Sequence, residues 1–162
     1  MNAREVPEGI SSYSNPTEAK AVVRLAKQIF RCTDGKTSIM AISRYKEQRR
    51  LISKFAGNEG FPLDARTTTG ALGAQADTVI VSITRNNHLY EVGAFGVLQD
   101  LNVAISRARE KLFIIGNWDM LERGWIKLPT TVSRGWRGVC WKLARLIDRY
   151  GSRIVAPVPL IQ

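Results

Sequence analysis

Residues 79–83 read Val-Ile-Val-Ser-Ile, an almost unbroken run of β-branched apolar residues that stands between polar, turn-rich stretches. A short run of this kind is typical of a strand that is buried on both faces of a parallel sheet. On either side of it, residues 37–43 and residues 111–116 have the same apolar character, and a shorter extended piece ends near Thr68. The sequence therefore predicts several strands in one parallel sheet.

Helical patterns alternate with these strands. Residues 15–18 (NPTE) supply an N-cap and a first turn, and the apolar residues that follow recur at helical spacing until Asp34-Gly35. Further helices are expected over residues 45–55, around residues 98–107 and over residues 136–150. The second of these is expected to present both Arg107 and Arg109 just before the strand at residues 111–116. This alternation predicts an α/β fold of three layers, a parallel sheet with helices on both faces.

In such sheets, ligands bind in the loops at the carboxyl ends of the strands. We therefore expect functional residues after Ser43, Thr68, Ser82 and Gly116. Residues 33–37 (TDGKT) contain a Gly-Lys-Thr that is similar to the end of a phosphate-binding P-loop, but Phe30 replaces the earlier glycine. The segment also follows a helix and precedes a strand, the reverse of a P-loop, so we expect an ordinary helix-ending turn.

The composition bounds the size and the class of the protein. The chain has 162 residues and 18.1 kDa, which suits one domain rather than a two-domain enzyme. Its formal net charge of +10 favours a polyanionic partner. Apolar runs of about five residues fall far short of the roughly 20 that span a bilayer, so we expect a soluble protein without a membrane partner. Cys32 and Cys140 lie too far apart in sequence to indicate a zinc site or a disulfide framework, so we expect a reducing intracellular compartment, the cytoplasm or the nucleus.

Four segments follow one another in a recognisable order. They are SSYSNPTEAKAVVRL (11–25), AISRYKEQ (41–48), TTTGALGAQADTVIVSITRNN (67–87) and DLNVAISRAR (100–109), the last followed by a strand and Gly116-Asn117. Together they resemble the second RecA-like motor domain of superfamily 1 helicases, in the five-prime-to-three-prime branch that includes nonsense-decay and senataxin-type enzymes. The resemblance covers residues 12–121, with residues 1–11 as a lead-in and residues 122–162 as a basic extension that contains the helix 136–150.

This resemblance implies roles for individual residues. Arg107 matches the arginine finger, which reaches the γ-phosphate of ATP held by a first motor domain. The other implied nucleotide-binding residues are Tyr45, Gln48, Gly73, Gln75 and Arg109. Tyr45 and Gln48 also fit a second interpretation, as a rim tyrosine and a solvated helix residue without a role in binding. The implied nucleic-acid-binding residues are Thr67, Arg85 and Asn86. No metal ligand is expected in this chain, because no acidic pair ends an apolar strand. ATP and Mg²⁺ would therefore require a first RecA-like domain in cis or in trans, and the chain alone is not expected to hydrolyse ATP.

The segments also depart from the family pattern. Arg44 stands where proline is usual, and Asp100 replaces an arginine. Within the third segment, Thr69, Leu72 and Gln75 replace Asp, Gln and Glu. Three interpretations follow. The first is a second motor domain that is a fragment or a split subunit of a DNA or RNA helicase, the second is a non-catalytic nucleic-acid-binding or regulatory module derived from one, and the third is a degenerate fragment with no independent role. The departures favour the second interpretation, and the retained Arg107 favours the first.

Basic residues outside these segments recur along two helix faces. They are Lys20, Arg24, Lys27 and Arg31 on the first helix, and Lys142, Arg145 and Arg149 on the last. Such a face either binds the phosphate backbone of single-stranded DNA or RNA or is simply a solvated polar surface. The sequence leaves both readings open.

Overall fold

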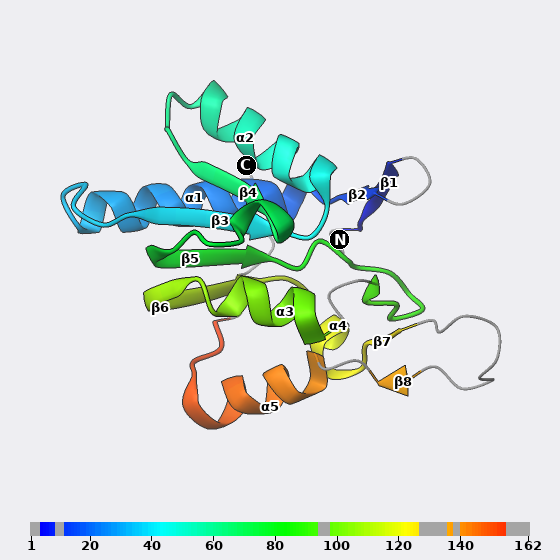
Figure 1. The fold of residues 1–162 in the computed structure, drawn as a ribbon. Coiled ribbons are helices and arrows are strands. Elements are labelled where there is room, and N and C mark those ends of the chain that lie inside the picture. The colour runs from blue at the N-terminus through cyan, green and yellow to red at the C-terminus, as the bar shows by residue number, and fades with distance from the viewer. Residues whose placement is uncertain (1–3, 9–11, 94–97, 127–135, 138–139, 155–162) are drawn as a thin grey trace.

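The structure, a computed structural model, describes residues 4–8, 12–93, 98–126, 136–137 and 140–154. Within these residues a four-stranded parallel sheet has the strand order β4-β3-β5-β6 (Figure 1). Its strands are β3 (Ile39–Ser43), β4 (Asp64–Thr67), β5 (Ala76–Ser82) and β6 (Ala108–Ile115). The two central strands are largely buried, as their apolar sequences predict, so the expected parallel α/β fold is confirmed.

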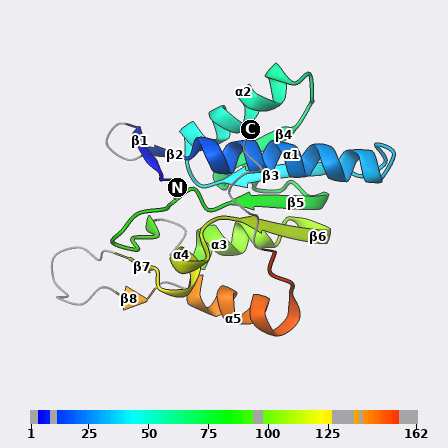
Figure 2. The ribbon, with the colours of Figure 1, turned by 180° about the vertical axis from the view of Figure 1, so that it is seen from behind.

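Two helices cover one face of the sheet, α1 (Pro16–Cys32) and α2 (Lys46–Asn58). α1 lies in front of the sheet in Figure 2 and behind it in Figure 1. Alternate side chains of the central strands, Ala41 and Ile80, point into the core beneath these helices. The helices contribute Ala19, Val22, Val23, Ala26, Ile52 and Ala56 to the same core.

The opposite face carries η1 (Thr69–Ala71), α3 (Leu98–Ile105), α4 (Trp118–Glu122) and α5 (Cys140–Tyr150). Its core contains the other set of strand side chains, Met40, Ile42, Val79 and Val81, together with Leu101, Met120, Leu143 and Ala144 from the helices. Because α5 shares this core, the described part of the C-terminal extension packs as part of the sheet domain. None of the described helices is long and apolar enough to cross a membrane.

Two small antiparallel pairs complete the described fold. β1 (Val6–Glu8) pairs with β2 (Ser12–Ser14) immediately before α1, and β7 (Trp125–Ile126) pairs with β8 (Trp136–Arg137). β8 lies where the sequence predicts the first turn of a helix over residues 136–150, so that boundary is wrong: the helix begins at Cys140. Residue 136 pairs with β7 as part of a strand and therefore does not belong to the helix.

The expected turn at residues 33–37 is confirmed. α1 ends at Cys32, and the next residues include Asp34 and Gly35 at φ values of 50° and 71°. The Gly35 N–H donates to the Phe30 carbonyl at 2.9 Å, which closes the end of the helix. This segment therefore precedes strand β3 and opens no helix, unlike a P-loop.

Candidate nucleotide and nucleic-acid sites

The residues implied by the sequence divide between the two ends of the parallel sheet. At the carboxyl end lie Tyr45, Gln48, Thr67, Arg85 and Asn86, which follow or end β3, β4 and β5. At the amino end lie Gly73, Gln75, Arg107 and Arg109, which precede β5 or begin β6. The structure thus separates Tyr45 and Gln48 from the other implied nucleotide-binding residues.

Arg107 lies in the turn between α3 and β6 and is half-buried. Its Nε donates to the Val103 carbonyl at 3.1 Å, its Nη1 to the Ala74 carbonyl at 3.4 Å and its Nη2 to the Ser106 hydroxyl at 2.9 Å. All three acceptors are neutral, and no salt bridge joins Arg107 to a carboxylate within the described residues. The guanidinium is therefore oriented by the protein, while its charge is not matched by an ion pair there.

Gly73 lies beside Arg107 at the tip of a tight turn. Leu72 has φ −59° and ψ 129°, Gly73 has φ 76°, and the Ala74 N–H donates to the Ala71 carbonyl at 3.1 Å. These values define a type II turn, which requires a positive φ at its third residue and so favours glycine. No described atom lies within 4 Å of a Cβ built on Gly73, so the space beside its backbone is open.

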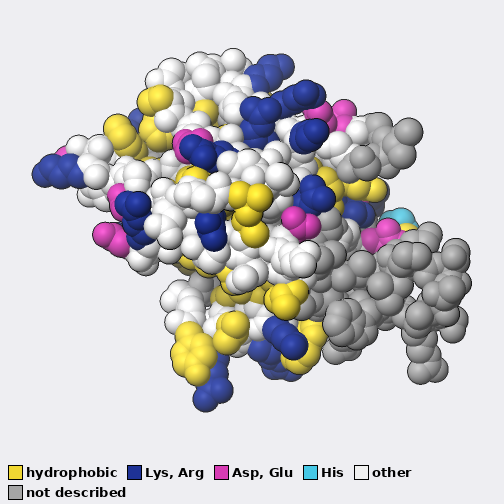
Figure 3. All heavy atoms as spheres, in the orientation of Figure 1, with side chains coloured by type: hydrophobic (Ala, Val, Ile, Leu, Met, Phe, Trp, Pro, Cys, Tyr) yellow, Lys and Arg dark blue, Asp and Glu magenta, His cyan; other side chains and the backbone are white. Residues whose placement is uncertain are grey.

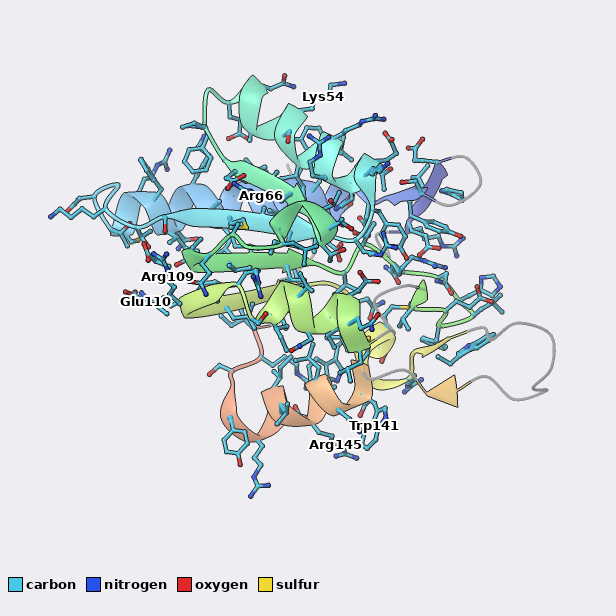
Figure 4. The ribbon with its side chains drawn as sticks, in the orientation of Figure 1. Lys54, Arg66, Arg109, Glu110, Trp141 and Arg145 are labelled. Carbon is cyan, nitrogen blue, oxygen red and sulfur yellow. The ribbon has the colours of Figure 1, made fainter. Side chains whose placement is uncertain are left out.

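Arg109 is exposed, and it lies on β6 rather than on the helix that the sequence predicts (Figure 4). The helix prediction is wrong here because the chain pairs with β5 from Ala108 onward, before the apolar part of the strand begins. Its Nε donates to Gln75 Oε1 at 3.4 Å, and its Nη1 lies 3.7 Å from Asp77 Oδ1. Two hydrogen bonds from Ser38, with a smaller contribution from Arg109, hold the pKa of Asp77 below its ordinary value.

Gln48 is fully buried, so the alternative of a solvated helix residue is wrong. Its Oε1 accepts a hydrogen bond from the Asn15 N–H at 2.7 Å. Its Nε2 donates to the Asn15 carbonyl at 3.3 Å and to the Ser82 hydroxyl at 3.0 Å. Gln48 therefore joins the start of α2 to the start of α1 and the end of β5.

Glu18, in the first turn of α1, is also buried beneath the carboxyl end of the sheet. One carboxylate oxygen accepts hydrogen bonds from the Ser82 hydroxyl at 2.8 Å and from the Thr84 N–H. Burial raises the pKa of Glu18 from 4.5 to about 8, because desolvation of the carboxylate outweighs the effect of these two hydrogen bonds. The group is therefore largely protonated at neutral pH.

Thr84 has a φ of 69°, which is strained for a β-branched residue. Besides the bond from its N–H to Glu18, its hydroxyl lies 3.0 Å from the Ser43 hydroxyl, and its carbonyl accepts from Asn15 Nδ2 at 3.4 Å. These contacts hold the backbone between the end of β5 and Arg85. Buried hydrogen bonds therefore keep Thr84 in a strained conformation directly beside Arg85, an implied nucleic-acid-binding residue.

Arg85 is only 5% exposed. Its guanidinium lies 4.0 Å from the ring centroid of Tyr13, and its Nε lies 2.8 Å from Glu5 Oε2. Tyr45 packs edge-on against the same Tyr13 ring and is 6% exposed, so it is no rim residue in this structure. Neither Arg85 nor Tyr45 presents a free surface in this arrangement.

The two departures Arg44 and Asp100 contact each other. Arg44 Nε lies 3.0 Å from Asp100 Oδ2, and the Thr68 hydroxyl donates to Asp100 Oδ1 at 3.1 Å. Arg44 and Asp100, which both depart from the family pattern, therefore form a complementary pair. Their contacts connect the end of β3 to α3, and the bond from Thr68 connects α3 to the end of β4.

We expect the Arg44–Asp100 pair to contribute a small coupling to stability. The Arg44 side chain is 40% exposed and that of Asp100 25% exposed, so solvent screens the pair. A double-mutant cycle of Arg44→Ala and Asp100→Ala in urea unfolding is expected to give a coupling of about 0.5 kcal/mol. A coupling of zero would show that the two residues are independent, and a coupling of opposite sign would show that their interaction is unfavourable.

Two residues at the carboxyl end lie outside the sequence-based predictions. Glu5 belongs to the lead-in, yet its carboxylate contacts Arg85, Asn86 and Asn87. Glu18 lies in the first of the four segments, but acidic residues are common in the first turn of a helix, so its sequence position does not indicate burial. Neither residue carries a sequence signal that would have identified it.

Comparisons with known proteins identify the family of this chain. The model of a family described as an AAA domain matches residues 1–119. The chain is 36% identical over 112 residues to probable helicase senataxin of Homo sapiens, which is 65% of this chain and 4% of that protein. It is 30% identical over 115 residues to the ATP-dependent helicase MJ0104 of Methanocaldococcus jannaschii, 69% of this chain and 16% of that protein. It is 27% identical over 128 residues to regulator of nonsense transcripts 1 of Caenorhabditis elegans, 75% of this chain and 12% of that protein.

The chain thus spans less than one fifth of the length of each of these relatives. The matched region includes all four segments that carry the sequence resemblance and extends over more than half of the chain. We conclude that the chain belongs to the AAA domain family and resembles the second RecA-like motor domain of senataxin-type and nonsense-transcript-regulator helicases.

Proposed function

We propose that this helicase-family domain acts as the second motor domain of an ATP-dependent DNA or RNA helicase, together with a first RecA-like domain in cis or in trans. The observation that carries this proposal is the state of Arg107. Three neutral acceptors hold its guanidinium at the amino end of the sheet, without an ion pair to a carboxylate among the described residues. A residue with those properties suits a phosphate that approaches from another domain.

In this proposal the first domain supplies the P-loop and Mg²⁺, and ATP bound there supplies the γ-phosphoryl group. Arg107 would donate its Nη hydrogens to phosphate oxygens that gain charge during transfer, in exchange for its contacts with Ala74 and Ser106. The open space at Gly73 would admit the approaching domain beside the turn. Gln75 and Arg109, which contact each other, would form the adjacent wall.

The carboxyl end of the sheet is the proposed side for nucleic acid. Thr67 and Asn86 lie there, and several Lys and Arg side chains of the neighbouring α2 gather at the top of the view in Figure 3. The basic residues of α2 are Lys46, Arg49, Arg50 and Lys54, against the single acid Glu47. Such a surface favours the phosphate backbone of a single strand.

A non-catalytic nucleic-acid-binding module is the second candidate. It is favoured by the Arg44–Asp100 contact, in which two departures from the family pattern pair with each other instead of facing a ligand. Under this alternative Arg107 would serve only to fix the turn before β6, through its contacts with Val103 and Ala74.

Both candidates predict that the purified chain binds single-stranded oligonucleotides with a strong dependence on salt. If about four phosphates are contacted, affinity should fall roughly 50-fold between about 50 mM and about 200 mM salt. Fluorescence anisotropy with labelled single strands of DNA and of RNA measures this directly. Absence of binding at low salt would contradict both candidates, and magnesium-dependent ATP turnover by the chain alone would contradict the need for a first domain.

A further inference from the structure

The carboxylate of Glu5 occupies a site lined by three donors. Glu5 Oε2 accepts hydrogen bonds from Arg85 Nε at 2.8 Å, from the Asn86 N–H at 2.6 Å and from Asn87 Nδ2 at 3.2 Å, and Asn87 Nδ2 also lies 3.4 Å from Oε1. A guanidinium, a backbone N–H and a side-chain amide that converge on one carboxylate make an anion site. We call these three donors the Arg85 cradle.

We propose that the Arg85 cradle is a phosphate-binding site that the chain fills with its own Glu5, and that a backbone phosphate of a single strand displaces this carboxylate. This inference rests on the proposed function and adds to it the occupant and the donors of one phosphate subsite.

Contacts that do not involve Glu5 hold the cradle in place. Arg85 lies over the Tyr13 ring, and a Cβ on Gly93 would come within 2.6 Å of Arg85 Nη1, so the following loop encloses the guanidinium. Asn87 Oδ1 accepts from the Glu91 N–H, and its Nδ2 donates to the Glu91 carbonyl, both at 3.0 Å. The donors would therefore keep their positions when Glu5 leaves, which is the preorganisation that a binding site requires.

A second anchor and a second acid also border the cradle. Asn86 Oδ1 accepts from Asn117 Nδ2 at 2.9 Å, which fixes the Asn86 side chain. Glu91 Oε2 lies 4.0 Å from Arg85 Nη2, too far for a hydrogen bond, and its side chain is 30% exposed. Glu91 therefore weakens the positive potential without occupying the site.

The segment that carries Glu5 is weakly held. In residues 4–8 every side chain except that of Glu5 is exposed, including Val6 at 43%, and none of them belongs to either hydrophobic core. Its remaining attachments to the described part of the chain are the β1–β2 pairing, the bond from the Ser14 hydroxyl to Glu8 at 3.0 Å and the bond from the Glu5 N–H to the Asn86 carbonyl at 3.4 Å. A segment without buried apolar area opens at low cost in free energy. A phosphate can replace the Glu5 bonds because it offers the same geometry of oxygen acceptors.

The test uses the full chain with Glu5→Ala, which empties the cradle. Glu110→Ala is the charge-matched control, because Glu110 is exposed on β6 at the amino end of the sheet, away from the cradle. Inorganic phosphate is titrated while the Asn86 N–H and the Arg85 Nε–H are followed by NMR. We expect Glu5→Ala to bind phosphate at these two groups about tenfold more tightly than the wild type, because the competing carboxylate is gone. Glu110→Ala should behave as the wild type does. If all three proteins bind phosphate equally, or if phosphate shifts only the NMR signals of other residues, the proposal that the Arg85 cradle binds phosphate is wrong.

A second arm identifies the source of the phosphate. Single-strand affinity, measured by anisotropy, should rise in Glu5→Ala by a similar factor and stay unchanged in Glu110→Ala. If the wild type binds single strands and Glu5→Ala binds them no better, the Arg85 cradle is not a subsite for nucleic acid, while the proposed function stands. If Glu5→Ala takes up inorganic phosphate but no protein binds a strand, the proposed function fails and the cradle binds free phosphate alone.

Discussion

Replacing Arg107 with alanine is expected to lower nucleic-acid-stimulated ATP turnover about 10³-fold in an assembly of this chain with a P-loop-bearing first domain. The physical reason is that a guanidinium without a protein carboxylate partner would stabilise charge on the transferred phosphoryl group more than on bound ATP. Arg107 donates to neutral acceptors alone among the described residues, so no protein anion competes for it. Steady-state turnover at saturating ATP measures the loss.

Two further variants make this result interpretable. Arg107→Lys keeps the charge but loses the planar fork, so it should recover only a small part of the activity. Lys111→Ala, at an exposed position on the strand that follows Arg107, β6, should have little effect. Turnover in Arg107→Ala within about threefold of the wild type would contradict the arginine-finger role, since removal of a single transition-state contact costs far more.

The second large effect is expected at Glu18. Its pKa is raised to about 8, so between about pH 4.5 and about pH 8 the folded state holds a proton that the unfolded state has released. The free energy of unfolding should therefore fall as pH rises through this window. Glu18→Gln removes the titration and keeps the shape of the protonated group. Relative to the wild type, this variant should gain about 2 kcal/mol in stability between about pH 5.5 and about pH 7.5.

Urea unfolding across this pH range measures the difference between the two proteins. Glu8→Gln is the matched control, because Glu8 is exposed and lies on β1, away from the buried network. Its free energy of unfolding should depend on pH as that of the wild type does. If Glu18→Gln also follows the wild type, Glu18 is ionised in the folded state, and the hydrogen bonds from Ser82 and Thr84 affect its pKa more than burial does.

The apolar strands made the fold predictable from sequence. β3 and β5 are recognisable because both faces are buried, and the Asn15 cap with Pro16 sets the start of α1 where the pattern places it. The first half of β6 is exposed, so its residues carry no apolar signal, and Arg109 was assigned to a helix for that reason. Pairing with a neighbour placed it on a strand, an effect that local patterns do not contain.

The candidate sites were predictable only as residues, since the motif order identifies Arg107, Gly73 and Arg85 but not their partners. The burial of Gln48 arises from its bonds with Asn15 and Ser82, which are 33 and 34 residues away in sequence. The contact of Glu5 with Arg85 spans 80 residues. Such long-range pairs depend on the packed fold, and a single sequence gives no sign of them.

Under the proposed function, this domain is part of an ATP-driven motor rather than a passive binding module. The most direct test measures single-strand affinity of the chain assembled with a P-loop-bearing first domain, in the presence of a non-hydrolysable ATP analogue and then of ADP. We expect the two nucleotide states to differ in affinity by about tenfold, the size of a typical coupling between sites, and Arg107→Ala to abolish the difference. Equal affinity in both states, with salt-dependent binding intact, would contradict the motor role and leave the binding module.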